Sequence, residues 1–248
     1  MNDHELKRLR ELLQNSRRAV FFGGAGVSTE SGVKDYRSKD GIYNTVKEYG
    51  VSPEVILSHS FFLNKTKVFY DFYYKYFLKN AAEPNAAHRA LAALEEKGHI
   101  AAVITQNIDG LHQRAGSRRV IELHGTVAET SCMKCGAPFP TEEIAALKGD
   151  VPRCPRCGGL VKPRVVLYDE ALPQEAIDAA LRSLEEADLL IIGGTSLTVY
   201  PAAGLIRYYG GRELVLINKQ TTPADEDASL LLRDPIGAVF AAVMEGFV

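Results

Sequence analysis

The chain has 248 residues, a formal net charge of −2 and 46% hydrophobic residues. These values are typical of a globular protein with one large domain or one and a half ordinary ones. Such a charge balance provides no basic field for nucleic acid and no polybasic membrane patch, so a nucleic-acid partner is unsupported. Residues 1–18 lack the apolar run of a signal peptide, and no stretch approaches the ~20 apolar residues that span a bilayer. We therefore expect a cytoplasmic protein without membrane association.

Hydrophobic periodicity predicts helices and strands that alternate along the chain. Leucines at helical spacing predict amphipathic helices, and short runs rich in β-branched residues predict buried strands. The predicted helices are residues 3–15, 68–78 and 86–97, and the predicted strands are residues 19–22, 100–104, 120–121, 187–192 and 213–217. This alternation predicts an α/β fold with a parallel sheet covered by helices on both faces. Residues 43–80, aromatic and charged, predict a small helical insertion instead.

Two polar stretches follow predicted strands and carry the main functional signal. They are Thr105-Gln106-Asn107-Ile108-Asp109-Gly110-Leu111-His112 and Glu122-Leu123-His124-Gly125. Open α/β sheets bind ligands at the carboxyl ends of their strands. Amide, carboxylate and imidazole side chains at these positions therefore predict a binding or catalytic site.

The loop after the first strand has some features of a dinucleotide-binding loop. Gly24-Ala25-Gly26 lets the backbone approach a pyrophosphate. Thr29 stands where the third glycine of the full fingerprint would fall, and no acidic residue ends a second strand about 20 residues on. A plain dehydrogenase therefore fits poorly. Tyr36 and Arg37 could close over a flat ring and a phosphate, or be a core residue and a surface charge.

The four cysteines form two Cys-x-x-Cys pairs, Cys132 with Cys135 and Cys154 with Cys157, separated by 18 residues. Two such turns facing each other suit one tetrahedral zinc ion. All four positions are then filled by protein sulfur, so this zinc would be structural. Two disulfides are the alternative, which a cytosolic setting disfavours.

Together these motifs resemble the sirtuins, the NAD-dependent protein lysine deacylases, over essentially the whole chain. The matching motifs are Gly24-Ala25-Gly26-Val27-Ser28, Asp35-Tyr36-Arg37, Thr105-Gln106-Asn107-Ile108-Asp109, Leu123-His124-Gly125, both Cys-x-x-Cys pairs, Gly194-Thr195-Ser196-Leu197 and Asn218. The resemblance implies a discontinuous Rossmann-like NAD-binding domain, and a small domain made of a helical insertion and a zinc ribbon. The implied boundaries are 1–40, 84–126 and 163–248 for the first, and 41–83 and 127–162 for the second.

The resemblance also implies which residues bind NAD. These are Ala25, Thr29 and Arg37 at the phosphates and near ribose, Thr195, Ser196, Asn218 and Ile236 at the adenosine, and Ile108 and Asp109 at the nicotinamide. Tyr36 stands where the family usually has Phe, which keeps an aromatic lid but adds a hydroxyl.

The implied reaction is displacement of nicotinamide by the acyl-lysine carbonyl oxygen, which gives an alkylamidate on ADP-ribose. His124 would then be the general base that deprotonates a ribose hydroxyl, because its ordinary pKa of ~6.5 lies near working pH. Gln106 and Asn107 would orient the ribose and a water, so that Gln106 and His124 also contact NAD. The products would be nicotinamide, O-acetyl-ADP-ribose and deacetylated lysine. His112, on a predicted helix, is interpreted as structural.

The acetyl-lysine protein or peptide is expected to bind as an extended strand between residues 165–170 and 194–200. Sirtuins that remove acidic acyl groups resemble one another in a Tyr-x-x-Arg pair, and Tyr73 stands here at the arginine position. We therefore expect neutral acyl groups to be preferred, in a channel lined by Phe61, Tyr70 and Leu167.

Three other functions remain open at this level. An ADP-ribosyltransferase would use the same NAD cleavage with another acceptor. A non-catalytic sensor of NAD or ADP-ribose would not need a base such as His124. A zinc-ribbon nucleic-acid module is disfavoured by the net charge and by the small part of the chain that the ribbon covers.

Overall fold

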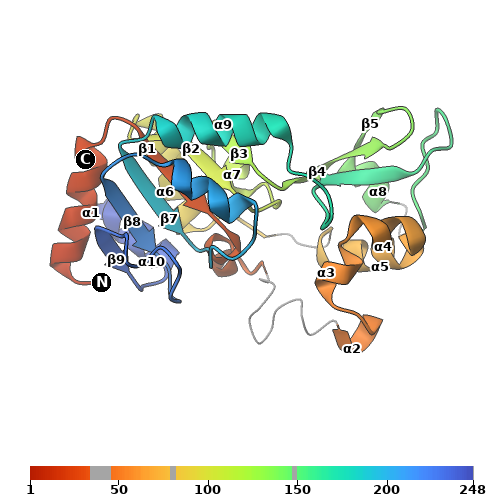
Figure 1. Cartoon of the computed structure of the whole chain (residues 1–248), viewed down its shortest axis with the longest axis horizontal. Coiled ribbons are helices and arrows are strands. Elements are labelled where there is room, and N and C mark those ends of the chain that lie inside the picture. The colour runs from red at the N-terminus through yellow and green to blue at the C-terminus, as the bar shows by residue number, and fades with distance from the viewer. Residues whose placement is uncertain (34–45, 79–81, 147–149, 248) are drawn as a thin grey trace.

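The computed structural model describes residues 1–33, 46–78, 82–146 and 150–247. Figure 1 shows an elongated molecule with a larger body at one end, built on a six-stranded sheet, and a smaller body at the other. Of the helices in these ranges, none is both long and apolar enough to cross a bilayer.

The larger sheet is parallel throughout, with the strand order β3-β2-β1-β7-β8-β9. Its strands are β1 (Ala19–Gly23), β2 (Ile100–Thr105), β3 (Val120–Glu122), β7 (Leu189–Gly193), β8 (Glu213–Ile217) and β9 (Leu230–Leu232). The order of the chain through the sheet reverses between β1 and β7, which makes their carboxyl ends the topological switch point. Ligands of open α/β sheets bind at such a point.

Helices cover both faces of this sheet, as the sequence predicts. One face packs against α1 (Asp3–Asn15), α6 (Ala86–Glu96) and α10 (Ile236–Glu245), and the other against α9 (Gln174–Glu185) and the 3-10 helix η4 (Ala202–Tyr208). Neighbouring residues of β1 alternate between the two cores, because Phe21 belongs to the first and Phe22 to the second. Burial on both faces explains why the strands read as continuous apolar runs.

Local capping explains where α1 begins and where α6 ends. The Asn2 side chain accepts from the Glu5 amide at 2.9 Å, and the Glu5 carboxylate accepts from the Asn2 amide at 2.7 Å, so a capping box starts α1. Gly98 follows α6 with φ of +83°, the left-handed conformation that ends helices. Strand β7 begins at Leu189 rather than 187, because the Asp188 carboxylate accepts from the Arg17 and Arg18 amides beside β1.

The smaller body combines helices with an antiparallel sheet of order β5-β4-β6. Its elements are α2 (Val46–Tyr49), α3 (Pro53–Ile56), α4 (His59–Asn64), α5 (Thr66–Tyr76), β4 (Gly125–Cys132), β5 (Pro138–Pro140), α8 (Thr141–Ala145) and β6 (Val161–Val165). Aromatic side chains of α4 and α5 share a core with Cys132, Val161 and Leu167. The predicted helical insertion is thus confirmed over its described residues. Strand β4 begins at Gly125, two residues before the predicted start of the zinc-ribbon insertion at position 127. The domain boundaries remain a prediction.

Candidate active site

Two loops cross at the switch point through their glycines. The Gly26 amide donates to the Gly194 carbonyl at 2.8 Å. Gly194 has φ of +60°, and a Cβ there would lie 2.4 Å from the Val27 nitrogen. Only glycine permits this approach. The crossing holds the short 3-10 helices η1 (Ala25–Val27) and η2 (Thr29–Ser31), and with them the predicted residues Ala25 and Thr29, beside β7.

A hydrogen-bond network connects this loop to the polar stretch after β2. The buried Ser28 hydroxyl donates to the Asp109 carboxylate at 2.6 Å and accepts from the Asn107 amide group at 3.0 Å. Asp109 also accepts from the Leu111 amide at 3.0 Å, at the start of α7 (Leu111–Arg114). The structure therefore connects the predicted site residues Asn107 and Asp109 through Ser28. The sequence alone indicates no role for Ser28, because its partner Asp109 lies 81 residues away along the chain.

His124 and Gln106 lie at the ends of neighbouring strands. The Gln106 carbonyl lies 2.8 Å from His124 Nδ1, and because a carbonyl only accepts, Nδ1 carries the proton and Nε2 presents a lone pair. Burial lowers the pKa of His124, and the bond to Gln106 opposes this less strongly. The Gln106 side chain donates to the Thr195 hydroxyl at 3.0 Å. A neutral imidazole with an accepting nitrogen has the chemistry of a general base.

The other predicted NAD contacts follow β7 and β8 or begin α10. Thr195 is buried, and the Ser196 hydroxyl lies 2.8 Å from that of Thr198. The Asn218 amide donates to the Leu232 carbonyl at 3.0 Å, which fixes Asn218 at the same sheet edge. Ile236 is 4% exposed and packs within the core. Tyr36 and Arg37 lie outside the described residues.

Two further histidines are buried close to the Ser28 network. His88 and His112 have ring centroids 4.7 Å apart, and His88 Nε2 lies 3.5 Å from the Ser28 hydroxyl. Burial lowers the pKa of His88 to about 4 and that of His112 to about 3. Both imidazoles are therefore neutral near pH 7. The structural role of His112 remains an interpretation. The sequence analysis missed His88, because Ser28 and His112, which lie beside its ring, come from other elements.

The four cysteines form one cluster, with all four sulfur atoms within 4.8 Å of one another. The Sγ atoms of Cys132 and Cys157 are 3.5 Å apart, and those of Cys135 and Cys154 are 3.7 Å apart. A tetrahedral zinc with Zn–S bonds of about 2.3 Å places its sulfurs about 3.8 Å apart, whereas a disulfide needs about 2.05 Å. The cluster thus fits one zinc and not two disulfides.

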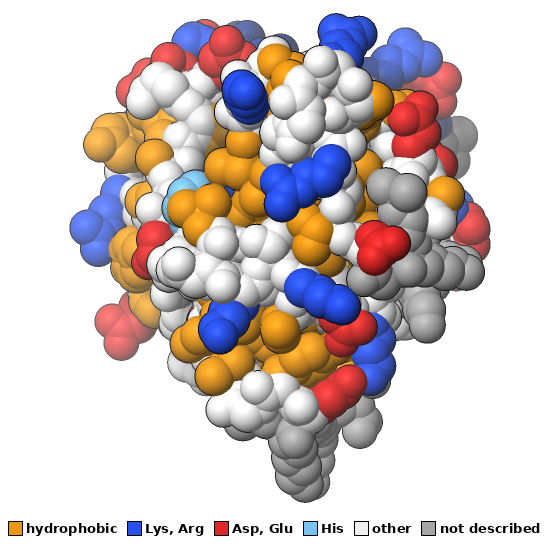
Figure 2. Space-filling view, turned by 90° about the vertical axis from the view of Figure 1, so that its right-hand side faces the viewer, with side chains coloured by type: hydrophobic (Ala, Val, Ile, Leu, Met, Phe, Trp, Pro, Cys, Tyr) orange, Lys and Arg blue, Asp and Glu red, His pale blue; other side chains and the backbone are white. Residues whose placement is uncertain are grey.

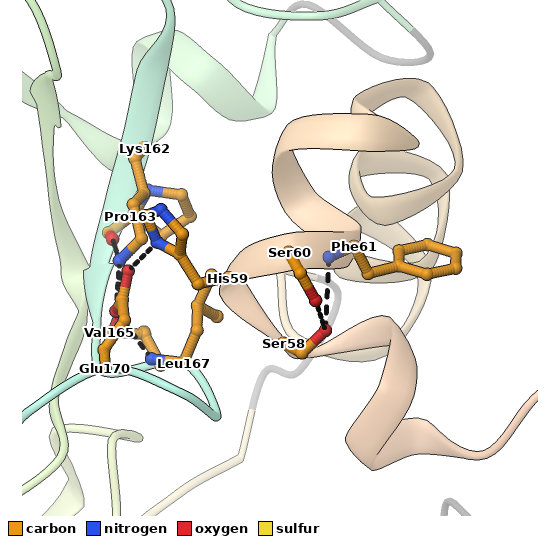
Figure 3. A network of polar contacts seen from close by, with 9 residues as sticks. All are labelled: Ser58, His59, Ser60, Phe61, Lys162, Pro163, Val165, Leu167 and Glu170. Carbon is orange, nitrogen blue, oxygen red and sulfur yellow. Dashed lines mark hydrogen bonds and ion pairs between the residues drawn. The ribbon is translucent and has the colours of Figure 1, made fainter.

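The segment after β6, where the peptide is expected, is held by the Glu170 carboxylate (Figure 3). Glu170 pairs with Lys162 Nζ at 2.9 Å and His59 Nδ1 at 2.7 Å, and accepts from the Leu167 amide at 2.8 Å. The Tyr168 amide and carbonyl also bond to the helical insertion, at the Leu57 carbonyl and the His59 amide, both 2.9 Å. Glu170 therefore connects β6 and α4 across the expected substrate segment.

An apolar cavity lies between this segment, the helical insertion and the loop after β2. It contains about 350 Å³ of space when the open solvent at its mouth is included. Its lining residues are Leu57, Phe69, Tyr73, Phe77, Ile108, Val165, Val166, Leu167 and Tyr168. Of the three residues expected to line an acyl channel, Leu167 is found here. Tyr70 instead donates to the Val161 carbonyl at 2.5 Å, and the Phe61 ring points away from this segment (Figure 3).

The surface of the smaller body bears on the nucleic-acid alternative. Figure 2 shows this end of the molecule, where basic, acidic and hydrophobic side chains are interspersed. On this face the described residues make no continuous basic field of the kind that binds the phosphate backbone of a nucleic acid.

Comparison with known proteins places these observations in one family. Residues 24–201 match the Sir2 family. An NAD-dependent protein deacetylase of Clostridium tetani (strain Massachusetts / E88) is 53% identical over 239 residues, which cover 96% of this chain and 97% of that protein. A solved structure described as Sir2 with a p53 peptide and NAD⁺ is 41% identical, with a TM-score of 0.87 and 97% of both chains covered. Another, described as a Sir2 variant with a deacetylated p53 peptide and 3'-O-acetyl-ADP-ribose, is 42% identical, with a TM-score of 0.88 and 97% of both chains covered.

Proposed function

The chain belongs to the Sir2 family, and from this premise we propose how its site performs the family's reaction. The protein is an NAD-dependent protein deacetylase that yields a deacetylated peptide and O-acetyl-ADP-ribose. It binds acetylated peptides. NAD supplies the ADP-ribose that accepts the acetyl group, and nicotinamide leaves.

The observation that carries the proposed mechanism is the bond between His124 and the Gln106 carbonyl. This bond fixes the imidazole as the tautomer with an accepting Nε2. We assign to Nε2 the removal of a proton from a ribose hydroxyl of the bound co-substrate. Gln106, tied to Thr195, and Asn107, tied to Ser28, are assigned to orient that ribose and a water.

The residues at the switch point fit an NAD molecule. The close glycine crossing holds in place the loop that carries Ala25 and Thr29, and the backbone amides of such a loop can bind a phosphate. We assign Thr195, Ser196, Asn218 and Ile236 to the adenosine half. Ile108 and Asp109 are assigned to the nicotinamide, and Arg37 and Tyr36 to the phosphate and the lid.

The four-cysteine cluster is assigned to one structural zinc, because its sulfurs fill every tetrahedral position. We also propose that the larger sheet with its helices forms the NAD-binding domain, with the predicted boundaries. A cytoplasmic location is proposed because a zinc-binding thiol cluster suits a reducing compartment.

Incubation of the protein with an acetyl-lysine peptide, with and without NAD, tests the function. Mass spectrometry should detect loss of one acetyl group and formation of O-acetyl-ADP-ribose only when NAD is present. Transfer of ADP-ribose to protein without deacetylation would instead identify an ADP-ribosyltransferase. Tight binding of NAD with neither product would identify a sensor.

A further inference from the structure

Tyr73 has a buried hydroxyl in an otherwise apolar wall. The side chain is 1% exposed and lines the cavity between the helical insertion and the substrate segment. Few buried side-chain polar atoms of the described residues lack a hydrogen-bond partner, and the Tyr73 hydroxyl is one of them. Among the residues that carry these unpaired atoms, Tyr73 alone lines the cavity. Buried polar groups in folded proteins normally have a hydrogen-bond partner, so an unpaired hydroxyl beside a cavity indicates a position where a ligand can bind.

The Tyr73 ring is held between two other aromatic rings. It stacks on Phe69 at 5.8 Å with an interplanar angle of 9°, and on Phe77 at 5.5 Å with an angle of 17°. These contacts fix the ring and with it the position of the hydroxyl. Burial also raises the pKa of Tyr73, so the hydroxyl stays protonated and can donate at neutral pH.

Neighbouring polar groups are already occupied. Tyr70, one helical turn earlier, donates to the Val161 carbonyl at 2.5 Å. On the opposite wall, the Val166 amide donates to the His124 carbonyl at 2.8 Å. Tyr168 also lines the cavity but is 43% exposed, so the Tyr73 hydroxyl is the buried side-chain group among the described lining residues with a hydrogen bond to offer.

The cavity connects the parts of the site that an acyl group would touch. Ile108, proposed for the nicotinamide pocket, lies on one side, and residues 165–168 of the expected peptide segment lie on another. The acyl chain of a bound lysine would thus enter between them and approach Tyr73.

We propose that the Tyr73 hydroxyl binds an oxygen on the acyl chain, so that the enzyme prefers short hydroxyacyl-lysines to the matching unsubstituted acyl-lysines. This inference rests on the proposed deacylase function. The reaction is unchanged: the hydroxyacyl group moves from the lysine nitrogen to ADP-ribose, and nicotinamide leaves. A carboxylate would find no cationic partner in the described part of the lining, because the lining residues there include no Lys or Arg.

The test compares 3-hydroxybutyryl-lysine with butyryl-lysine in one peptide, since these groups differ by one oxygen. In the wild-type protein kcat/KM should be higher for the hydroxyacyl peptide by about fivefold to tenfold, the worth of one typical hydrogen bond. Tyr73→Phe removes only the hydroxyl and keeps the stacked ring. This variant should lose the preference, so that the ratio of the two kcat/KM values falls to about one.

Tyr70→Phe is the matched control, because its hydroxyl is bonded to Val161 and should affect stability without changing the preference. If the ratio of kcat/KM for the hydroxyacyl peptide to kcat/KM for the butyryl peptide were the same in wild type and Tyr73→Phe, the inference would be overturned. Turnover of acetyl-lysine, measured in the same experiment, separates the two hypotheses. If acetyl-lysine is not turned over, the proposed deacylase function fails. If it is turned over, the experiment tests the acyl preference alone.

Discussion

His124 is prepared for proton transfer by two opposing effects on its pKa. Burial disfavours the charged imidazolium and lowers the pKa, and the Gln106 carbonyl opposes this by accepting from Nδ1. Burial is the larger effect, so the imidazole is neutral at physiological pH. The same bond points the accepting nitrogen away from Gln106. A single short contact thus sets both the protonation state and the orientation of the proposed base.

We expect His124→Ala to fold, to bind NAD and to lose deacetylation by at least ~100-fold, the lower range for general acid–base catalysis. Nicotinamide exchange should persist, because it precedes the proton transfer. Steady-state kinetics and an exchange assay measure the two effects. His4→Ala, an exposed position on α1, is the matched control and should retain full activity. Unchanged turnover in His124→Ala would show that the assigned base is wrong.

The lowered pKa of His124 also predicts the acid limb of the pH profile. A base with a lowered pKa remains neutral, and active, below its ordinary value of 6.5. We therefore expect the acid limb of kcat/KM to have its midpoint below pH 6.5. An acid limb with its midpoint at or above 6.5 would contradict this prediction.

At the scale of elements, the smaller body depends on two polar centres that hold short strands and turns together. The cysteine cluster connects the turn after β4 to the turn before β6. The Glu170 carboxylate connects β6 to α4. Strands as short as β5 and β6 bury little apolar surface, so their positions depend on such centres.

We expect Cys132→Ala to lose zinc and to lose soluble folded protein, because metal binding at such sites contributes directly to folding. Elemental analysis should find one zinc per wild-type chain. Met133→Ala lies in the same turn, is 45% exposed and binds no metal, so it should keep its zinc. Active wild-type protein without zinc would refute the structural site.

Glu170→Gln tests whether the Glu170 carboxylate positions the substrate segment. Burial alone would raise the pKa of Glu170, but the Leu167 amide, Lys162 and His59 together lower it, so the group is ionised. The neutral amide of the glutamine in this variant cannot replace the charge-assisted hydrogen bonds of the carboxylate. We expect KM for the peptide to rise about fivefold to tenfold, with a smaller change in kcat.

Glu129→Gln is the control for that measurement. It breaks an ion pair with Arg164 on the same small sheet, whose side chains are 56% and 60% exposed. Exposed pairs contribute little, so KM should stay close to the wild-type value. If Glu170→Gln also left KM unchanged, the carboxylate would not position the peptide.

At the scale of the whole molecule, the acyl cavity exists because segments far apart in the chain meet. Tyr73 and Phe77 come from the helical insertion, Ile108 from the loop after β2 and Val166 from the segment after β6. The cavity therefore lies where the two bodies of Figure 1 meet. The buried side chains that line it are apolar apart from the Tyr73 hydroxyl, which makes the choice of acyl group a property of the assembled fold.

We expect acetyl-lysine to be processed and succinyl-lysine poorly or not at all. Among the described lining residues, a carboxylate that entered this cavity would lose water without gaining a cationic partner, which is strongly unfavourable. Comparing kcat/KM for the two acyl groups on one peptide checks this. Tyr73→Arg should shift the ratio towards succinyl by supplying a guanidinium. A succinyl value equal to or above the acetyl value in the wild-type protein would disprove the prediction.

The sequence by itself determined part of the secondary structure and the motifs from which the candidate site was predicted. Apolar runs predicted β1 and β2, because burial on both faces leaves a continuous signature in the chain. Cysteine spacing predicted the cluster, since each turn brings its own two sulfurs together. His124 was predicted because strand ends are where such sheets bind ligands.

Only the tertiary structure decided the contacts between distant residues. Ser28 meets Asp109 across 81 positions, and His59 meets Glu170 across 111. Which of Tyr70 and Tyr73 keeps an unpaired hydroxyl also depends on a third element, because the Val161 carbonyl reaches only Tyr70. Periodicity and spacing are local properties of a chain. Hydrogen bonds and burial depend on which surfaces pack together, and packing is settled only when all the elements are in place.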